Sequence, residues 1–321
     1  MNQVQDPMSD TEESRRLPER PRVLILANLA KEEVVEALAD FRPWLVERAE
    51  IVAEPDICEL TSERAAELPE ADLAIVLGGD GTMLAQARKM VALGVPLLGI
   101  NFGKLGFLAE FTIDDVKLHW DEVLCGGCRV SERLMLEAMV FPAGAPRWGE
   151  GAGDDLSGMP EPVFRSIAMN DAVITAGPPY RMIDLDLAIE PRRSLHSSVQ
   201  FAGDGVIIAT PSGSTAYNLS AGGPILSPGI DGVVISALAP QSLAFRPIVF
   251  HARCEAWLTV LRANAGTTLV IDGQDSATIA EGQQLLVRQH GSRVRLIHNP
   301  DHNYWTMLSY KMRWAAQPRR R

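Results

Sequence analysis

The sequence predicts two domains, an N-terminal α/β domain with a parallel sheet and a C-terminal β-sandwich or similar all-β domain. A chain of 321 residues is long for a single hydrophobic core. Aliphatic runs alternate with amphipathic segments up to about residue 125, which is typical of a parallel sheet with right-handed crossovers. Beyond that point, short apolar runs follow one another with turn residues between them, which indicates an all-β domain.

The first domain is assigned to residues 21–125, and four aliphatic runs predict its strands: residues 22–27, 50–53, 73–77 and 96–101. Apolar residues at helical spacing predict helices between these strands. In the first helix, Pro43 either ends the helix or opens a second helical piece. Residues 116–124 predict the last helix of the domain. Residues 1–20 are charged, contain two prolines and show no periodicity, which predicts a disordered tail.

The second domain is assigned to residues 126–299. Short apolar or alternating runs predict its strands: residues 134–141, 166–174, 183–190, 205–210, 254–261, 268–271, 284–288 and 294–297. Residues 142–162 are rich in Gly, Pro, Asp and Glu and predict a long exposed loop. Near the C-terminus, residues 305–314 predict a weak helix.

Composition excludes several classes of partner. The net charge is −11, and the one basic cluster is residues 319–321, which argues against nucleic-acid binding. No apolar run reaches the roughly 18 residues of a membrane span, so we expect no membrane partner. The N-terminus is polar and acidic and has no secretory apolar region, so we expect a cytoplasmic protein.

The CxxC formed by Cys125 and Cys128 requires a separate interpretation. A zinc site would require a second close pair of ligands, and none of the six histidines provides one at motif spacing. A redox motif would place its first cysteine at the start of a helix, whereas this one follows the helix predicted at residues 116–124. We therefore expect a helix end with a glycine C-cap. A metal or redox protein remains an alternative that metal analysis would decide.

The most informative stretch is residues 78–82 (GGDGT), which lie between a predicted strand and a predicted helix. Its glycines leave the backbone bare, and a helix N-terminus offers free N–H groups, which together suit a phosphate. A carboxylate repels phosphate, so Asp80 fits this turn only if the site also needs a base or a metal ligand. Both roles stay open for Asp80.

A second candidate stretch is residues 203–224, where a strand leads into a turn rich in hydroxyl groups and a short predicted helix. Residues 205–230 carry no charge, and the hydroxyl groups are those of Ser212, Ser214, Thr215, Tyr217 and Ser220. Clustered neutral donors and acceptors suit a sugar or a nucleobase. The alternative is a polar turn with an N-capping residue.

Four motifs resemble those of the NAD kinases, which are ATP:NAD 2′-phosphotransferases, and they occur in the family's order: residues 78–82 (GGDGT), 99–108 (GINFGKLGFL), 170–171 (ND) and 210–217 (TPSGSTAY). The resemblance extends over residues 22–314. The first motif alone would be unspecific, because diacylglycerol kinases, sphingosine kinases and phosphofructokinases carry similar turns.

The resemblance implies a Rossmann-like, phosphofructokinase-like first domain and an active site in the cleft between the two domains. It implies that the C-terminal segment, residues 300–321, packs on the first domain. NAD and ATP are the implied substrates, with polyphosphate as a possible donor in some bacteria. Mg²⁺ or another divalent cation is the implied cofactor. A homodimer or homotetramer is implied, in which a neighbouring subunit commonly completes the site.

Site residues follow from these motifs, with Asp80 chosen as the base that accepts the proton of the ribose hydroxyl. Backbone N–H groups would hold the phosphates at Gly78, Gly79, Gly81 and Thr82. The resemblance implies adenine contacts at Asn170, Ser212, Thr215 and Ala216, with Phe107 packing nearby. It implies that Asp171 and Tyr217 hold ribose and phosphate groups. It places Asp204 and Asp272 at the nicotinamide side or at the neighbouring subunit. No dedicated metal ligand is predicted.

Three departures from the family pattern leave details open. Ala202 stands where many bacterial members have Arg, which leaves tolerance of NADH open. The CxxC and the length of the loop at residues 142–162 are also unusual; this loop could be an exposed insert or an oligomer contact. Two alternative functions remain. A lipid kinase of the diacylglycerol or sphingosine type would share residues 78–82 but not the pair at 170–171. A non-catalytic NADP-binding regulator would have no use for Asp80 as a base.

Overall fold

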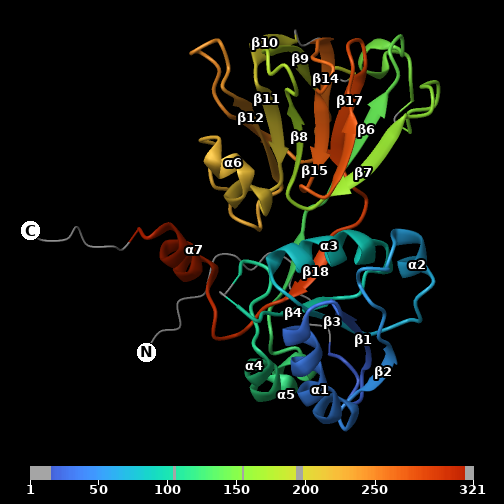
Figure 1. The fold of residues 1–321 in the computed structure, drawn as a ribbon, viewed down its shortest axis with the longest axis vertical. Helices are drawn as coiled ribbons and strands as arrows, with labels where there is room; N and C mark the ends of the chain where they lie inside the picture. The colour runs from blue at the N-terminus through green and yellow to red at the C-terminus, as the bar shows by residue number, and fades with distance from the viewer. Residues whose placement is uncertain (1–15, 104–105, 154, 193–197, 315–321) are drawn as a thin grey trace, which may run out of the picture. The chain divides into compact units, whose positions relative to one another are not determined.

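The computed structural model describes residues 16–103, 106–153, 155–192 and 198–314 (Figure 1). These residues form two compact units, of which the second runs from Arg133 to Arg293 and the first contains the rest. The predicted boundaries at residues 125 and 299 lie a few residues away, because the strands at Val130–Arg133 and Val294–Ile297 both belong to the sheet of the first unit. Residues 1–15 of the predicted tail lie outside the described residues.

The described part of the first unit contains a six-stranded sheet with the order β2-β1-β3-β4-β18-β5. Its strands are β1 (Arg22–Ala27), β2 (Glu50–Ala53), β3 (Leu73–Leu77), β4 (Leu97–Ile100), β5 (Val130–Arg133) and β18 (Val294–Ile297). The pairs β1–β2, β1–β3, β3–β4 and β4–β18 are parallel, as the sequence predicts for the first four strands. Figure 1 shows β18, in the red part of the chain, within this sheet of otherwise early elements. A short apolar run does not reveal which sheet a strand will join.

The helices of the first unit are α1 (Glu32–Val46), α2 (Ser62–Ala66), α3 (Asp80–Met90), the 3₁₀ turn η1 (Val91–Leu93), α4 (Ile113–Leu118), α5 (Trp120–Cys125) and α7 (Tyr304–Met312). Among them, α1, α4 and α5 share an apolar core with this sheet. α1 continues through Pro43 without a break. Proline inside a helix costs about 3 kcal/mol, but burial of Phe41 and Leu45 on either side contributes roughly 1.5–3 kcal/mol each and holds the helix on the sheet. α5 ends at Gly126 in a left-handed conformation, the C-cap that the sequence predicts.

The described part of the second unit contains two six-stranded sheets with the orders β10-β9-β14-β17-β6-β7 and β13-β12-β11-β8-β15-β16. The strands of the first sheet are β6 (Leu136–Phe141), β7 (Phe164–Ala168), β9 (Ile183–Ile189), β10 (Val199–Gly203), β14 (Ala256–Arg262) and β17 (Gln284–Gln289). Those of the second are β8 (Asp171–Thr175), β11 (Gly205–Ala209), β12 (Gly232–Leu238), β13 (Ile248–His251), β15 (Thr268–Ile271) and β16 (Asp275–Thr278). Their pairings are antiparallel. Both sheets contribute to one apolar core, for example with Leu258 and Ile208, so the predicted β-sandwich is confirmed.

The stretch predicted as one strand at residues 166–174 is two strands in different sheets. β7 ends at Ala168, and β8 begins at Asp171 in the other sheet. The chain therefore crosses between the two sheets at Met169 and Asn170. The polar pair Asn170–Asp171 marks this crossing in the sequence, but apolar residues stand on both sides of it because both strands contribute to the core.

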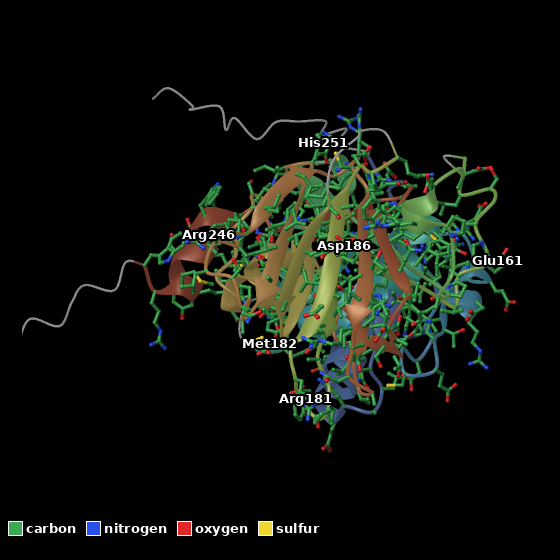
Figure 2. The ribbon with its side chains drawn as sticks, turned by 90° about the horizontal axis from the view of Figure 1, so that it is seen from above. Glu161, Arg181, Met182, Asp186, Arg246 and His251 are labelled. Carbon is green, nitrogen blue, oxygen red and sulfur yellow. The ribbon has the colours of Figure 1, made fainter. Side chains whose placement is uncertain are left out.

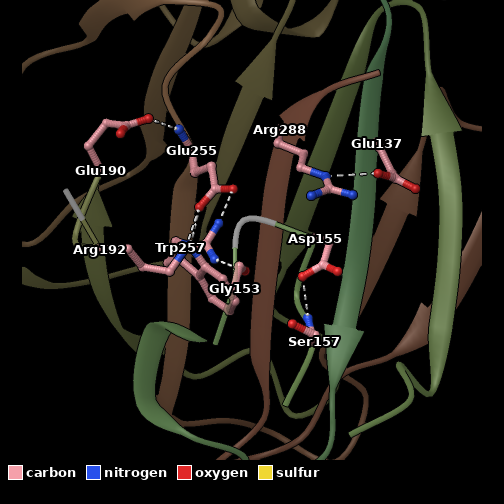
Figure 3. A network of polar contacts seen from close by, with 9 residues as sticks. All are labelled: Glu137, Gly153, Asp155, Ser157, Glu190, Arg192, Glu255, Trp257 and Arg288. Carbon is pink, nitrogen blue, oxygen red and sulfur yellow. Dashed lines mark hydrogen bonds and ion pairs between the residues drawn. The ribbon is translucent and has the colours of Figure 1, made fainter. Parts of the chain in front are cut away.

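The sequence predicts an exposed loop at residues 142–162, but the structure shows that part of this loop is buried against the sheet that contains β6 and β14. It contains the short turn η2 (Arg147–Gly149) and packs on the outer face of the first sheet. Strand alternation places Phe141 and Trp257 on that face, and Leu156 of the loop joins them in a separate apolar cluster. Figure 3 shows Arg192 paired with Glu255 and donating to the carbonyl of Gly153 at 2.7 Å, which fastens the loop to the sheet.

The polar side chains of the same face support this packing. Asp186, labelled on β9 in Figure 2, is fully buried because Arg147 of the loop lies over it, with Nη2 2.6 Å from Oδ2. Gln284 accepts a hydrogen bond from the N–H of Trp148 at 2.7 Å and donates to the carbonyl oxygen of Ala145. The insert is therefore a covering layer of the sheet. No helix in the described residues is long and apolar enough to cross a membrane.

Candidate active site

The glycine turn that begins α3 is open at two of its glycines. Gly79 is the N-cap of α3 with an extended backbone, and Asp80 is the first helical residue. A Cβ added to Gly79 or Gly81 would meet no described heavy atom within 4 Å, so a ligand can approach the backbone there. A Cβ on Gly78 would lie 2.6 Å from the side chain of Thr82, so that position requires glycine. An open backbone at the N-terminus of an 11-residue helix suits an anion.

The carboxylate of Asp80 is held by the second glycine-rich stretch. Its Oδ2 accepts a hydrogen bond from the N–H of Phe107 at 2.8 Å. Its Oδ1 accepts from the N–H groups of Leu108 at 2.9 Å and Ala109 at 3.1 Å. A Cβ added to Gly106 would overlap this carboxylate, which explains the glycine. The prediction that the two glycine-rich stretches face each other is confirmed.

Helix α7 reaches the same place from the C-terminal end of the chain. Lys311 Nζ lies 4.0 Å from Asp80 Oδ2 and 4.4 Å from the centroid of the Phe107 ring. The rings of Phe107 and Tyr304 are 6.0 Å apart. α7 belongs to the first unit, as the family resemblance implies for residues 300–321; residues 315–321 of that segment lie outside the described residues. Sequence reasoning missed Lys311. The available signal was its spacing of three from Leu308 and seven from Tyr304, which puts it on the same helix face.

In the second unit, Asp272 organises the crossing between the two sheets. With Gly273 and Gln274 it forms the three-residue connection of the β15–β16 hairpin, in which Asp272 and Gly273 both have positive φ. Its Oδ1 accepts from the N–H groups of Asn170 at 2.8 Å and Asp171 at 2.9 Å, and Oδ2 accepts from Met169 at 2.8 Å. A turn aspartate is thus directed inward, onto the backbone of the Asn–Asp pair.

Asp171 is an unusual carboxylate. It is buried at the start of β8, and burial together with the negative charge of Asp272 raises its pKa to about 7. Perturbed groups of this kind are enriched at functional sites, although structural networks produce them too. Near neutral pH, Asp171 is therefore able to change its protonation state when a partner approaches.

The hydroxyl-rich segment at residues 210–220 contains buried side chains that hold the local fold and exposed side chains that a ligand could contact. Thr210 and Ser214 are fully buried: Thr210 donates to the carbonyl of Met169 at 2.5 Å, and Ser214 donates to Pro211 and accepts from Leu226. These bonds fix the 3₁₀ turn η3 (Gly213–Thr215) and α6 (Tyr217–Ser220) beside Asn170. The partly or largely exposed members are Ser212, Thr215, Ala216, Tyr217 and Ser220. The available groups coincide with the predicted binding residues.

In a single copy of the chain, Asp204 lies away from Asn170, Asp171 and Asp272. It is exposed and precedes β11, whereas Thr210 follows the same strand. At roughly 3.3 Å per residue, the two ends of β11 are more than 10 Å apart. Ala202 lies on β10, where it pairs with Asp184. The structure thus brings Asn170, Asp171 and Asp272 together but not Asp204.

The fold and these two groups of residues define the class: a phosphotransferase that acts on a nucleotide. The ATP-NAD kinase N-terminal domain matches residues 23–128, and the ATP-NAD kinase C-terminal domain matches residues 169–299. The NAD kinase of Rhodopirellula baltica is 34% identical over 297 residues, covering 92% of this chain and 88% of that protein. The NAD kinase of Aromatoleum aromaticum is 39% identical over 256 residues, covering 78% and 77%. The chain belongs to the NAD kinase family.

Solved structures support the fold. A yeast NADH kinase complexed with NADH matches with a TM-score of 0.75 at 23% identity, covering 94% of this chain and 89% of that one. An Archaeoglobus fulgidus NAD kinase in complex with ATP matches with a TM-score of 0.65 at 21% identity, covering 91% and 98%. The predicted family and fold class are confirmed, and with the family the predicted activity, ATP-dependent phosphorylation of NAD.

Proposed function

We propose that Asp80 is the general base in the transfer of the γ-phosphoryl group of ATP to the 2′-hydroxyl of the adenosine ribose of NAD. The hydroxyl oxygen attacks the γ-phosphorus, the bond to the β–γ bridging oxygen breaks, ADP leaves, and the hydroxyl proton passes to the carboxylate. The position of Asp80 supports this role: it is the first residue of α3, beside the open glycine backbone.

The hydrogen bonds of Asp80 fit a base that must not move. Three N–H groups orient it, two on Oδ1 and one on Oδ2. A carboxylate has about four lone-pair positions, so one on Oδ2 remains for the proton. Orientation by backbone groups requires no reorganisation during the reaction.

The remaining site residues have two proposed tasks. The backbone at Gly79, Gly81 and Thr82 binds phosphate groups, whereas the N–H of Gly78, which the family motif also suggests, already donates to the carbonyl oxygen of Ile100 at 2.8 Å. The adenosine is recognised by groups that the family motifs assign, and Phe107 is one of them, as a residue that packs near the adenine. In the second unit, Asn170, Ser212, Thr215 and Ala216 contact the adenine, Asp171 and Tyr217 hold ribose and phosphate oxygens, and Ser220 adds a hydroxyl donor. The family motifs support this assignment, as does the partial or larger exposure of all these residues of the second unit except Asp171, which is buried.

A divalent cation is proposed to arrive with ATP. In the described part of the chain, no group of three or more His, Cys, Asp or Glu residues is placed to hold a metal ion. Mg²⁺ usually keeps several waters and is held largely by substrate phosphates, which would lie at the open backbone of Gly79 and Gly81. The residues present therefore fit a cation carried by the nucleotide. When bound, it would neutralise phosphate charge.

A homodimer or homotetramer is proposed, in which Asp204 contributes to the nicotinamide side of a neighbouring subunit's site. Its distance from Asn170 and Asp171 along β11 supports that placement. Asp272 is proposed to act near the same substrate by fixing the Asn–Asp pair. A cytoplasmic location is proposed as well, because all four cysteines are free thiols, which fits a reducing compartment.

The test is incubation with NAD, ATP and Mg²⁺, followed by detection of NADP with an NADP-specific dehydrogenase. We expect NADP to form. Turnover without NADP, or phosphate transfer to extracted lipid, would favour a lipid kinase. Binding of NADP without any turnover would indicate a regulator. Replacing NAD by NADH in the same assay answers the question that Ala202 raises.

A further inference from the structure

Lys311 is a cation near Asp80 that the proposed mechanism does not use. Its ammonium group lies 4.0 Å from Asp80 Oδ2 and 4.4 Å from the centre of the Phe107 ring. Three segments that are distant in sequence thus meet at one point: the glycine turn, the loop at residues 106–109, and α7.

The sequence of α7 explains how Lys311 reaches this point. Asn303 caps the helix by accepting hydrogen bonds from Trp305 at 2.9 Å and Thr306 at 3.3 Å. Met307 and Leu308 are buried and fix the helix on the first unit. Lys311 follows these residues by four and three positions, so it lies on the anchored face. Its side chain is 27% exposed, so the ammonium group is accessible to a ligand.

A purely structural ion pair explains this arrangement poorly. A separation of 4.0 Å exceeds hydrogen-bonding distance, so the ammonium group donates no hydrogen bond to Asp80. The Asp80 carboxylate already has three N–H donors. Partly exposed pairs of this kind contribute about 0–1 kcal/mol. Helix packing would be served equally well by an apolar side chain at this position.

We propose that Lys311 is a catalytic residue that binds the phosphoryl group during its transfer. This inference rests on the proposed function of Asp80. The transferred group carries negative charge next to the carboxylate of the base, and these charges repel each other. A cation beside both groups offsets that repulsion, and lysine provides three donors on a flexible stem.

Proton transfer strengthens the effect of Lys311. When Asp80 accepts the hydroxyl proton it becomes neutral, so the attraction of Lys311 to the carboxylate ends. Its charge then acts on the phosphoryl oxygens, where charge is present in the transition state. Lys311 forms no covalent bond and keeps its protons throughout. The aromatic ring of Phe107 holds the ammonium group in place before ATP binds.

The test compares Lys311→Met, Lys311→Arg and a matched control, Arg313→Met, which removes one positive charge from the exposed end of the same helix. We measure kcat and KM for NAD and ATP with Mg²⁺, together with thermal unfolding. Lys311→Met should lower kcat by about 10²–10³-fold, as for loss of one charge-stabilising donor, with little change in KM for NAD. The kcat of Lys311→Arg should be at least about tenfold higher than that of Lys311→Met, because arginine retains the positive charge.

Two results would overturn the proposal. One is a kcat of Lys311→Met close to that of Arg313→Met. The other is a loss that Lys311→Arg does not recover and that follows a fall in melting temperature, which would make Lys311 an anchor of α7. If the wild-type chain formed no NADP, the proposed function would fail separately. Binding of inorganic tripolyphosphate to wild type and Lys311→Met would then decide whether Lys311 binds phosphate, with about tenfold weaker binding expected for the variant.

Discussion

The carboxylate of Asp272 accepts a hydrogen bond from the backbone N–H of Asp171 at 2.9 Å, so one acidic residue fixes the position of another. The same carboxylate also holds the N–H groups of Met169 and Asn170. The three residues form the crossing between the two sheets of the second unit. Asp272 therefore helps to determine where the Asn–Asp pair lies.

Replacing Asp272 by Asn tests this positioning role. Asn tolerates the positive φ of this position, but its amide group turns a donor toward one of the three N–H groups. We expect a loss of about 1–3 kcal/mol in the free energy of unfolding and a higher KM for NAD. Asp275→Asn in the same hairpin is the control, since Asp275 is exposed and bonds the hydroxyl of Ser166. Equal effects of the two substitutions would contradict the role.

The raised pKa of Asp171 predicts a pH-dependent contribution to stability. Burial and the charge of Asp272 raise that pKa to about 7, so between about pH 4 and 7 the folded chain holds a proton that the unfolded chain has lost. The free energy of unfolding therefore falls as pH rises through this range. The free energy of unfolding of Asp171→Asn minus that of wild type should therefore increase by about 2 kcal/mol when the pH is raised from 5 to 8. Denaturant unfolding without ligand measures this, and a difference independent of pH would be the contrary result.

Two glycines of the loop that faces Asp80 form a matched pair. A Cβ at Gly106 would overlap the Asp80 carboxylate, whereas among the described heavy atoms one at Gly103 would come within 4 Å of Asn101 Oδ1 alone, at 3.9 Å. Gly106→Ala should displace the carboxylate and lower kcat by about 10²-fold, as for a misplacement of about 1 Å. Gly103→Ala should leave kcat nearly unchanged. Steady-state assays decide, and a fully active Gly106→Ala variant would show that the orientation of Asp80 is unimportant.

The ion pair between Arg147 of the insert and the buried Asp186 predicts that Arg147→Ala destabilises the protein and that a second substitution at Asp186 restores stability. Arg147→Ala leaves the buried carboxylate of Asp186 without its cation. We expect a loss of about 3 kcal/mol, near the lower end for a broken buried pair because Arg147 itself is half exposed. Adding Asp186→Asn should recover most of the melting temperature. If the double variant were no more stable than Arg147→Ala, the pair would not be the source of the defect.

Most of the fold could be predicted because aliphatic runs and their spacing determine strands and helices locally. The exceptions depend on packing. The burial of Phe41 and Leu45 carries α1 through Pro43, and β18 returns to a sheet begun more than 200 residues earlier. The insert at residues 142–162 covers the sheet that contains β6 and β14, because strand alternation places Phe141 and Trp257 on the outer face of that sheet and makes this face apolar. No single run of residues in the sequence reveals this second apolar face.

The candidate site was predictable where a motif carried it. The meeting of Asp80 with residues 107–109 follows from the shared edge of parallel strands. The direction of Asp272 was not predictable, because an aspartate before glycine is common in turns and its side chain usually faces water. The contact of Lys311 with Phe107 depends on how the C-terminal helix returns to the first unit, which local sequence does not encode.

The central claim is that Asp80 acts as the base, and the rate of Asp80→Asn tests it most directly. Asn retains an oxygen for the N–H groups of Leu108 and Ala109 and loses the acceptor for Phe107, so the fold should persist. We predict that kcat for NADP formation falls by about 10²–10⁴-fold while the melting temperature stays close to that of wild type. A folded Asp80→Asn variant with a rate near that of wild type would contradict the account.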